Sequence, residues 1–335
     1  MIATMPRTFA PIAAVLSASL LLACTWPPGA APAARRSAEE ATAPPAPGSS
    51  APQDDSPASV PAPPPASSAS ASDERYDLRA DIERRKVEAL RELGPNTKTE
   101  VVEGVFVLVA PTGFDLAGSG ELLRRTLAAY FHERFDKRPA KALTVYLFAS
   151  ADPYETFCRK RFHEPCMSPY GFFHPEPRFI VMNAGPGLGT LTHELVHPII
   201  ESDFPTAPTW LDEGIASLFE APVLPRPREV HGVKNWRHPR LLAAMGSSKE
   251  KAKVSLPALF GMSDEFFRGA DESLNYVIAR TFCLWLDARG QLFPFYRAFR
   301  DGRAGDPTGV KAFLAVTKQT PSEANADFLR FARSL

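Results

Sequence analysis

The spacing of hydrophobic and polar residues divides the chain into three segments. Residues 10–23 form one short apolar run, and residues 25–72 contain very few large apolar side chains. From residue 73 onward, apolar positions recur with the periods of helices and strands. This pattern predicts one folded domain over residues 73–335, which is long enough to bury a substantial core.

The first half of this domain is predicted to contain both helices and strands. Apolar residues three to four positions apart predict helices, and β-branched or continuous apolar stretches predict strands. The predicted helices are residues 77–93, 120–135 and 152–162. The predicted strands are residues 100–110, 143–148, 171–173 and 178–183, and the last two pair around a turn. Strand 178–183 is either an edge strand that is open to an extended peptide or a fully buried strand.

The second half is predicted to be mainly helical. A helix begins near residue 190, after a glycine-containing turn, and further helices follow it. These are residues 211–220, 273–289, 293–302, 307–317 and 321–334. Residues 222–253 are poorly periodic, which predicts a loop or a lid. Strands first and helices afterwards indicate an α+β fold, with a small mixed sheet packed on the helix near residue 190 and a mainly helical half after it.

The apolar run near the N-terminus is typical of a secretory signal. It follows Arg7 and is too short for a convincing transmembrane helix. Its end, Leu-Leu-Ala-Cys24, resembles the bacterial lipobox, in which the cysteine is lipidated and becomes the mature N-terminus. An ordinary signal peptide with an incidental cysteine is the alternative. Residues 1–24 are thus predicted to be a lipoprotein signal, and Thr25, in the place of a retaining aspartate, favours an outer-membrane anchor that faces the periplasm or the cell exterior.

Residues 25–72 are predicted to be a disordered linker, because proline, alanine, serine and glycine bury too little surface to offset the loss of chain entropy. The whole chain carries 38 basic and 38 acidic residues, so its formal net charge is zero. No basic field therefore indicates a nucleic-acid partner. Attachment to a membrane is expected to come from the N-terminal lipid alone.

Three cysteines remain after Cys24, and export favours a disulfide between two of them. Cys158 and Cys166 enclose a short polar loop that contains a proline, so we expect them to pair. A second metal site of Cys158, His163 and Cys166 is the alternative, although its spacing matches no common zinc module. Cys283 lies in an apolar helix and is expected to be a small buried side chain.

Residues 193–197 read His-Glu-Leu-Val-His and contain the parts of a zinc-hydrolase centre. Residues four apart lie on one face of a helix, so His193 and His197 can direct their rings at one metal ion. Glu194 lies about 100° further round the helix, where it can hold a zinc-activated water instead of the metal. The alternative is a helix whose two histidines only form hydrogen bonds.

A second cluster, Trp-Leu-Asp-Glu213-Gly followed by Ala216, favours the metal site over this alternative. Together with the five-residue motif, it resembles the gluzincin-type, peptidase MA-like zinc metallopeptidases over roughly residues 101–302. The resemblance implies that Glu213, on the helix after the histidine helix, completes a site of two histidines and one glutamate for one Zn²⁺ ion. It also implies a zincin-like fold and hydrolysis of peptide bonds, with Glu194 as general base and the zinc stabilising the developing oxyanion.

The neighbours of these residues leave several roles open. Asp212 could be the third ligand in place of Glu213, but the two lie about 100° apart on a helix, so only one faces the metal easily. Pro198 is expected to bend or end the helix just past the site, and Glu201 is expected to be solvated. Several gluzincins carry an acidic residue four positions after the glutamate ligand, where this chain has Ser217. The residue that orients each histidine is therefore not identified.

A donor of a hydrogen bond to the transition state is also expected. Tyr276 lies where the resembled family often carries such a tyrosine, and a core tyrosine on an amphipathic helix is the alternative. Tyr170 and His231 are weaker candidates for the same role. The remaining histidines are expected on the surface or in loops.

The sequence thus predicts a lipid-anchored zinc metallopeptidase that acts on peptide or protein substrates in the cell envelope. A rival from another class is a non-catalytic, zinc-stabilised module that binds an envelope partner. A third possibility is amide hydrolysis in cell-wall peptides, which uses the same chemistry.

Overall fold

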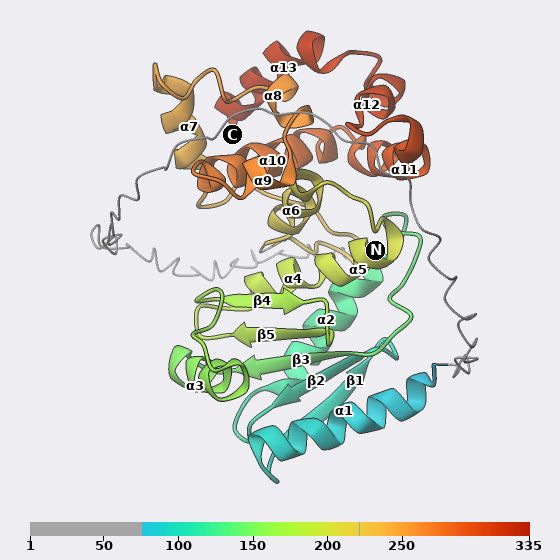
Figure 1. Cartoon of the computed structure of the whole chain (residues 1–335). Helices are drawn as coiled ribbons and strands as arrows, with labels where there is room; N and C mark the ends of the chain where they lie inside the picture. Colours follow the sequence, from blue (N-terminus) through green and yellow to red (C-terminus); the bar gives the residue numbers. More distant parts are fainter. Residues whose placement is uncertain (1–75, 221) are drawn as a thin grey trace, which may run out of the picture. The chain divides into compact units, whose positions relative to one another are not determined.

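The computed structural model describes residues 76–220 and 222–335, and the first half of this part is built on one five-stranded sheet (Figure 1). The predicted leader and linker, with Cys24, lie outside the described residues. The strand order is β1-β2-β3-β5-β4, with antiparallel pairs at both edges and parallel pairs in the centre. The strands are β1 (Lys98–Val102), β2 (Phe106–Ala110), β3 (Leu143–Phe148), β4 (Gly171–His174) and β5 (Phe179–Asn183). The expected α+β class with a small mixed sheet is therefore confirmed.

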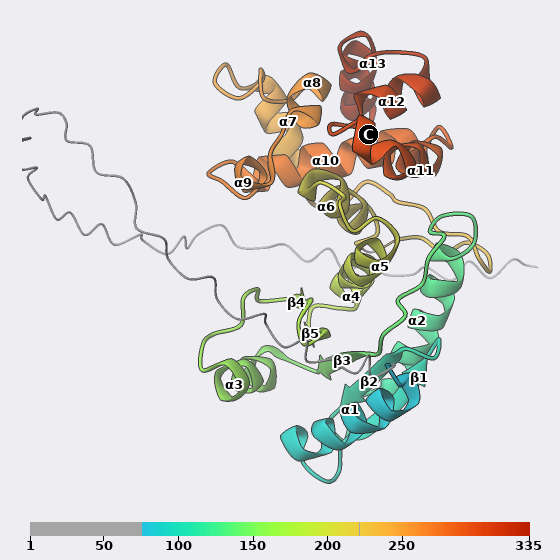
Figure 2. The same ribbon diagram turned by 45° about the vertical axis from the view of Figure 1, so that its right-hand side comes forward.

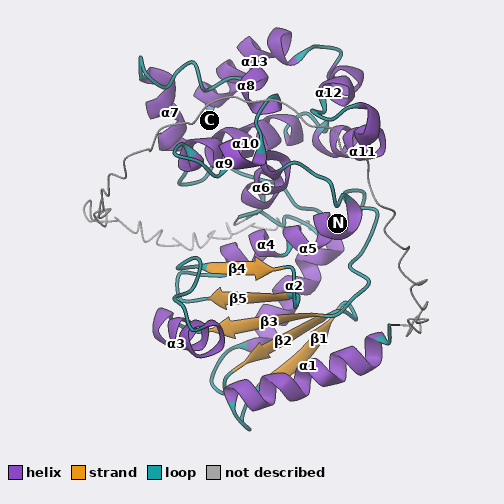
Figure 3. Ribbon diagram, viewed as in Figure 1, coloured by secondary structure: helices purple, strands orange, loops and turns teal. Residues whose placement is uncertain are grey.

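Helices cover both faces of the sheet, so its central strands are apolar on both sides (Figure 3). On one face, alternate strand residues such as Val107, Tyr146 and Val181 belong to a core with α1 and α3. On the other face, residues such as Leu108 and Ile180 join a larger core with α2 and the later helices. The helices are α1 (Leu78–Leu93), α2 (Leu116–Tyr130) and α3 (Ala151–Phe162).

The single strand predicted over residues 100–110 is wrong, because these residues form the hairpin β1–β2. Glu103 and Gly104 both have positive φ, 49° and 72°, and the amide of Val105 donates to the carbonyl of Val102. Two successive positive φ angles turn the chain back tightly, and a glycine supplies one of them at little steric cost. The Glu-Gly pair was the available signal, and the apolar residues on both sides of it concealed the turn.

The order of the last two strands decides which one has a free edge. Of the two interpretations left open for strand 178–183, the edge strand is wrong, because β5 pairs with β3 on one side and β4 on the other. All five residues of β5 are buried, as the alternative interpretation expected. Strand β4 instead forms this edge of the sheet, and it contacts α4.

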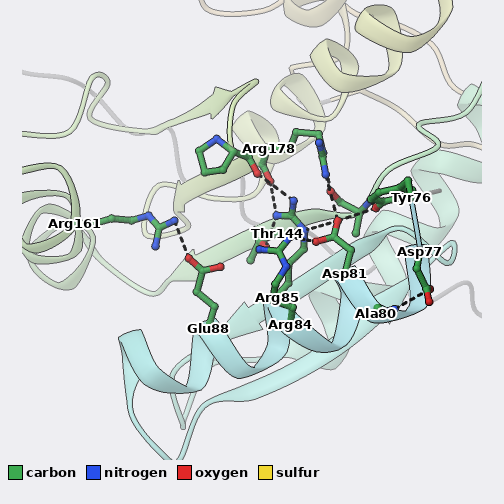
Figure 4. A network of polar contacts seen from close by, with 12 residues as sticks. Tyr76, Asp77, Ala80, Asp81, Arg84, Arg85, Glu88, Thr144, Arg161 and Arg178 are labelled. Carbon is green, nitrogen blue, oxygen red and sulfur yellow. Dashed lines mark hydrogen bonds and ion pairs between the residues drawn. The ribbon is translucent and has the colours of Figure 1, made fainter. Parts of the chain in front are cut away.

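A buried polar network fastens α1 to the sheet, and we call Tyr76, Asp81, Arg85, Thr144 and Arg178 the α1 clamp (Figure 4). The Arg85 guanidinium lies 3.2 Å from a carboxylate oxygen of Asp81 and donates to the Thr144 hydroxyl and to the carbonyls of Pro177 and Arg178. The hydroxyl of Tyr76 and the side chain of Arg178 donate to the same carboxylate at 2.7 and 3.2 Å. The clamp therefore holds α1 against the turn between β4 and β5.

The second half is helical, as expected, and packs on the sheet through the helices that follow β5 (Figure 2). The most extensive contact between two helices is that of α6 (Thr209–Leu218) with α10 (Glu272–Asp287). The other helices are α4 (Gly189–Glu194), α5 (Val196–Asp203), α7 (His238–Gly246), α8 (Leu256–Phe260), α9 (Asp264–Phe267), α11 (Leu292–Gly302), α12 (Val310–Thr317) and α13 (Pro321–Ser334). Helix α7 corrects the prediction that residues 222–253 lack regular structure: Pro239 at its start, which fits the first turn of a helix, was a usable signal. Within the described residues, no helix has the length and apolar character that crossing a membrane requires.

Candidate metal centre

The two histidines of the motif lie on consecutive helices that together replace the single helix predicted. His193 lies near the end of α4 and His197 in the first turn of α5, and the helical hydrogen-bond pattern lapses at Leu195. Leu195 keeps helical dihedral angles, so the chain continues in nearly the same direction. Pro198 has no N–H to donate to the carbonyl of Glu194, which explains the lapse. Pro198 was expected to bend or end the helix just past the site. The interruption lies between the two histidines instead, and α5 continues to Asp203.

Glu213 reaches the histidines from α6. Its Oε2 atom lies 3.4 Å from Nε2 of His193 and 4.0 Å from Nε2 of His197, and one ligand atom from each residue lies within 4.8 Å of the others. Ligand atoms around one tetrahedral zinc ion are separated by about 3.4 Å. Glu213 Oε2 is also buried without a hydrogen-bond partner. A buried acceptor without a partner is costly unless a cation completes it, so the donor set fits Zn²⁺.

A close contact between helices sets the position of Glu213. The next residue, Gly214, faces α10, and a Cβ atom there would lie 2.9 Å from Sγ of Cys283 and 3.0 Å from the carbonyl oxygen of Ala279. Glycine therefore lets α6 approach α10 closely. On the other side, the Thr192 hydroxyl donates to the carbonyl of Phe219 at 2.7 Å and ties α4 to the end of α6. These two contacts fix the position of α6, and so they fix the position of Glu213 relative to the two histidines.

Glu194 lies beside this group without belonging to it. One of its carboxylate oxygens is 3.9 Å from Nε2 of His197, and the side chain is buried against the cavity wall. Burial raises the pKa of Glu194 because it disfavours the charged form, and the neighbouring histidines oppose this only in part. A carboxylate whose pKa is moved toward neutrality suits a general base.

Asp212 is the partner of His197 that the sequence did not identify. Its Oδ1 lies 2.9 Å from Nδ1 of His197, so it can accept a hydrogen bond from that nitrogen and leave Nε2 toward Glu213. Burial alone would lower the pKa of His197, but the charges of Asp212 and Glu213 raise it to about 10. Asp212 is therefore placed to orient a candidate ligand, and the group whose atoms could hold a metal contains Glu213 instead. Two adjacent acids on one helix were the signal, since they point about 100° apart.

Arg268 is a second site residue that sequence reasoning missed. Its guanidinium contacts Oε1 of Glu213, and it donates to the hydroxyl of Tyr276 at 2.6 Å. Burial opposes ionisation of Glu213, but its basic neighbours hold the pKa of Glu213 well below the usual range. Tyr276 lines the same cavity, and burial raises its pKa further above the ordinary value of 10, so the hydroxyl is protonated at neutral pH as for any tyrosine. No local pattern around residue 268 indicated this role.

The group opens into a cavity of about 920 Å³. Residues of the edge strand β4 and the preceding loop form one wall, and residues of α5 and α10, together with Arg268 just after α9, form others. Tyr170 lies on the wall, whereas His231 pairs with Glu229 at 2.9 Å and does not line the cavity. Glu201 is exposed at the rim, as expected.

Cys158 and Cys166 form a disulfide, so their thiols are not free to bind a second metal with His163. The bridge closes the loop that leads to Met167, Ser168 and Tyr170 on the cavity wall. Cys283 is a buried free thiol. Among residues 76–220 and 222–335, the histidines and acids converge in ligand geometry only at His193, His197 and Glu213.

Comparison with known proteins adds no assignment. No protein-family model matches the chain, and no curated protein sequence is significantly similar to it. The class of the site is therefore defined by its chemistry alone: two imidazoles and one carboxylate that fit a zinc ion, with a separate buried carboxylate beside them.

Proposed function

We propose that this protein is an exported, zinc-dependent peptidase of the gluzincin type with a zincin-like fold. The observation that carries the proposal is the convergence of His193, His197 and Glu213 beside Glu194 on the wall of an open cavity. The order of elements supports it as well. An edge strand, two consecutive helices with one histidine each and a following helix with the glutamate occur in the sequence in that order.

Zinc held by these three residues would acidify a water molecule and polarise a carbonyl group. Glu194 accepts the proton of the attacking water and later passes it to the leaving amine. Asp212 keeps His197 in the tautomer that presents Nε2. Tyr276, with its hydroxyl protonated, donates a hydrogen bond to the oxygen on which negative charge develops.

The free edge of β4 on the cavity wall is the feature that supports peptides as the substrate class. Strand β4 pairs with β5 on one side only, so its other edge keeps backbone donors and acceptors for an extended peptide. Residues 171–173 of this strand line the cavity next to the two histidines. A substrate bound along β4 would therefore pass Glu194.

The disulfide between Cys158 and Cys166 supports export, because such bridges persist in oxidising compartments. We place the protein in the cell envelope, attached to the outer membrane by a lipid on Cys24. Labelling with radioactive palmitate tests the anchor. Label should appear in the wild type and be lost in Cys24→Ala, and label that persists in this variant would contradict the anchor.

The catalytic proposal is tested with metal analysis and a peptide library. The wild type should purify with one zinc ion per chain, and a chelator should abolish cleavage. Glu194→Gln should keep the zinc and lose activity by about 10²–10⁴-fold, the usual contribution of a catalytic base. Wild-type turnover by this variant would contradict the role of Glu194. Wild-type protein without stoichiometric zinc would instead favour a non-catalytic binding module, and cleavage restricted to cell-wall peptides would favour the amidase.

A further inference from the structure

Arg268 connects two parts of the candidate centre that lie far apart in the sequence. One guanidinium nitrogen contacts Oε1 of Glu213, and the other donates to the Tyr276 hydroxyl at 2.6 Å and to Glu272 at 3.2 Å. The first partner is a candidate metal ligand and the second a candidate transition-state donor. The planar guanidinium can hold both at once, whereas an ammonium group presents a single nitrogen.

The contact leaves only one oxygen of Glu213 facing the histidines. Oε1 is occupied by Arg268, and Oε2 is the buried atom without a hydrogen-bond partner, 3.4 Å from Nε2 of His193. The Glu213 side chain is 6% exposed and that of Arg268 is 49% exposed, so the carboxylate of this ion pair is buried while the arginine reaches it from the cavity side. Rotation of the carboxylate toward binding through both oxygens would break the contact with Arg268.

The segment that carries Arg268 is itself held in place at several points. Asp264, at the start of α9, accepts a hydrogen bond from the amide of Thr209, where α6 begins, at 2.8 Å. The buried side chain of Asn275 donates to the carbonyls of Phe266 and Phe267 at 3.2 and 3.1 Å. Phe267 is fully buried, and its ring packs on that of Tyr276 with centroids 5.1 Å apart. Helix α9 is thus fastened to the helix of the ligand and to the helix of the donor.

From these contacts we infer that Arg268 is a positioning residue, which holds Glu213 in one-oxygen ligation and fixes the Tyr276 hydroxyl beside it. The inference rests on the proposed zinc-peptidase function. It predicts that geometry, and not charge alone, is what the arginine contributes. Arg268→Lys keeps the charge but loses the second nitrogen of the guanidinium. It should therefore behave more like Arg268→Met than like the wild type.

Cobalt substitution tests the link to Glu213 without any substrate. Protein loaded with Co²⁺ should show the strong visible absorption of a four-coordinate ion in the wild type. The absorption should weaken in Arg268→Met and Arg268→Lys, because Glu213 is then free to bind through both oxygens and raise the coordination number. Arg240→Met is the matched control: Arg240 forms a two-point pair with Glu250 outside the cavity, and its loss should leave the spectrum unchanged. Circular dichroism checks that each variant is folded.

A double variant tests the link to Tyr276. With the zinc enzyme and a cleaved library peptide, Arg268→Met should lower kcat by about 10–100-fold with little change in KM. In a Tyr276→Phe background the same substitution should have a clearly smaller effect, since the hydroxyl that it positions is gone. A Co²⁺ spectrum unchanged by Arg268→Met, or effects on kcat that multiply fully, overturns the inference and leaves the peptidase proposal intact. Failure of the wild type to bind either metal overturns both.

Discussion

The α1 clamp and the candidate metal centre are both clusters of buried charge, but they differ in how their polar atoms are paired. In the clamp, Asp81 accepts from several donors, and no buried side-chain nitrogen or oxygen of its five residues lacks a partner. In the metal centre, Oε2 of Glu213 and Nδ1 of His193 are buried without partners. A complete network is what buried charges need for stability. A buried carboxylate oxygen that faces two imidazole nitrogens without a hydrogen bond instead fits a place prepared for a cation.

The clamp should therefore affect stability, and the centre should affect metal binding. The largest effect on stability is expected for Asp81→Asn, which tests the clamp because it leaves the guanidinium of Arg85 buried without its counter-charge. We expect the free energy of unfolding in urea to fall by about 3–5 kcal/mol at neutral pH. Zinc stoichiometry in the folded variant should remain that of the wild type. A normal unfolding midpoint would contradict the role of the clamp.

The stability difference between the wild type and Asp81→Asn should also depend on pH. Burial opposes ionisation of Asp81, but the hydrogen bond from Tyr76 and the charge of Arg85 outweigh it and lower the pKa of Asp81 below its ordinary value of 3.8. A carboxyl group with a lowered pKa stabilises the fold above the unfolded-state value and loses that contribution as the pH falls through the folded-state value. Wild type and Asp81→Asn should thus converge in stability below pH 3.8.

Gly214→Ala perturbs the centre through packing instead of charge. The added methyl group would meet the Ala279 carbonyl, so α6 must move away from α10, at a cost of about 1–3 kcal/mol in stability. Because Glu213 moves with the helix, zinc affinity in a competition with a chelating dye should also fall. Gly246→Ala is the matched control, since nothing lies within 4 Å of a Cβ atom there. Equal behaviour of the two variants would contradict the close-contact explanation.

Asp212→Ala separates orientation of a ligand from ligation. Without the acceptor 2.9 Å from Nδ1, the ring of His197 loses its preferred tautomer and direction. We expect zinc affinity to fall by about 10–100-fold, as for other residues that support a metal ligand. Asp212→Asn keeps an oxygen acceptor and should lose less. A complete loss of zinc in both variants would instead assign Asp212 as a ligand.

The smallest expected effect on stability is that of His193→Leu. The substitution removes a candidate ligand and a buried nitrogen that has no partner. Zinc binding should be lost, while the free energy of unfolding of the metal-free protein should stay within about 1 kcal/mol of the wild type. A destabilisation as large as that of Asp81→Asn would remove the distinction between the two clusters.

Local features of the site were predictable from the sequence because they depend on short-range geometry. The four-residue spacing of His193 and His197 brings them to one face on any helix, and the same rotation separates Asp212 from Glu213. The continuous apolar stretch of residues 143–148 predicted a strand, and these residues form β3. Strands, helices and the α+β class follow from such periods.

Other features depend on contacts between residues that are distant along the chain, and only the tertiary structure decides them. The free edge belongs to β4 because β5 pairs with β3, a choice that no strand pattern contains. Arg268 reaches Glu213 across 55 residues because α9 docks on α6 and α10. Periodicity describes which face of an element is buried but not which partner covers it. The candidate ligands could therefore be proposed from the sequence, whereas the residues that hold them in place could not.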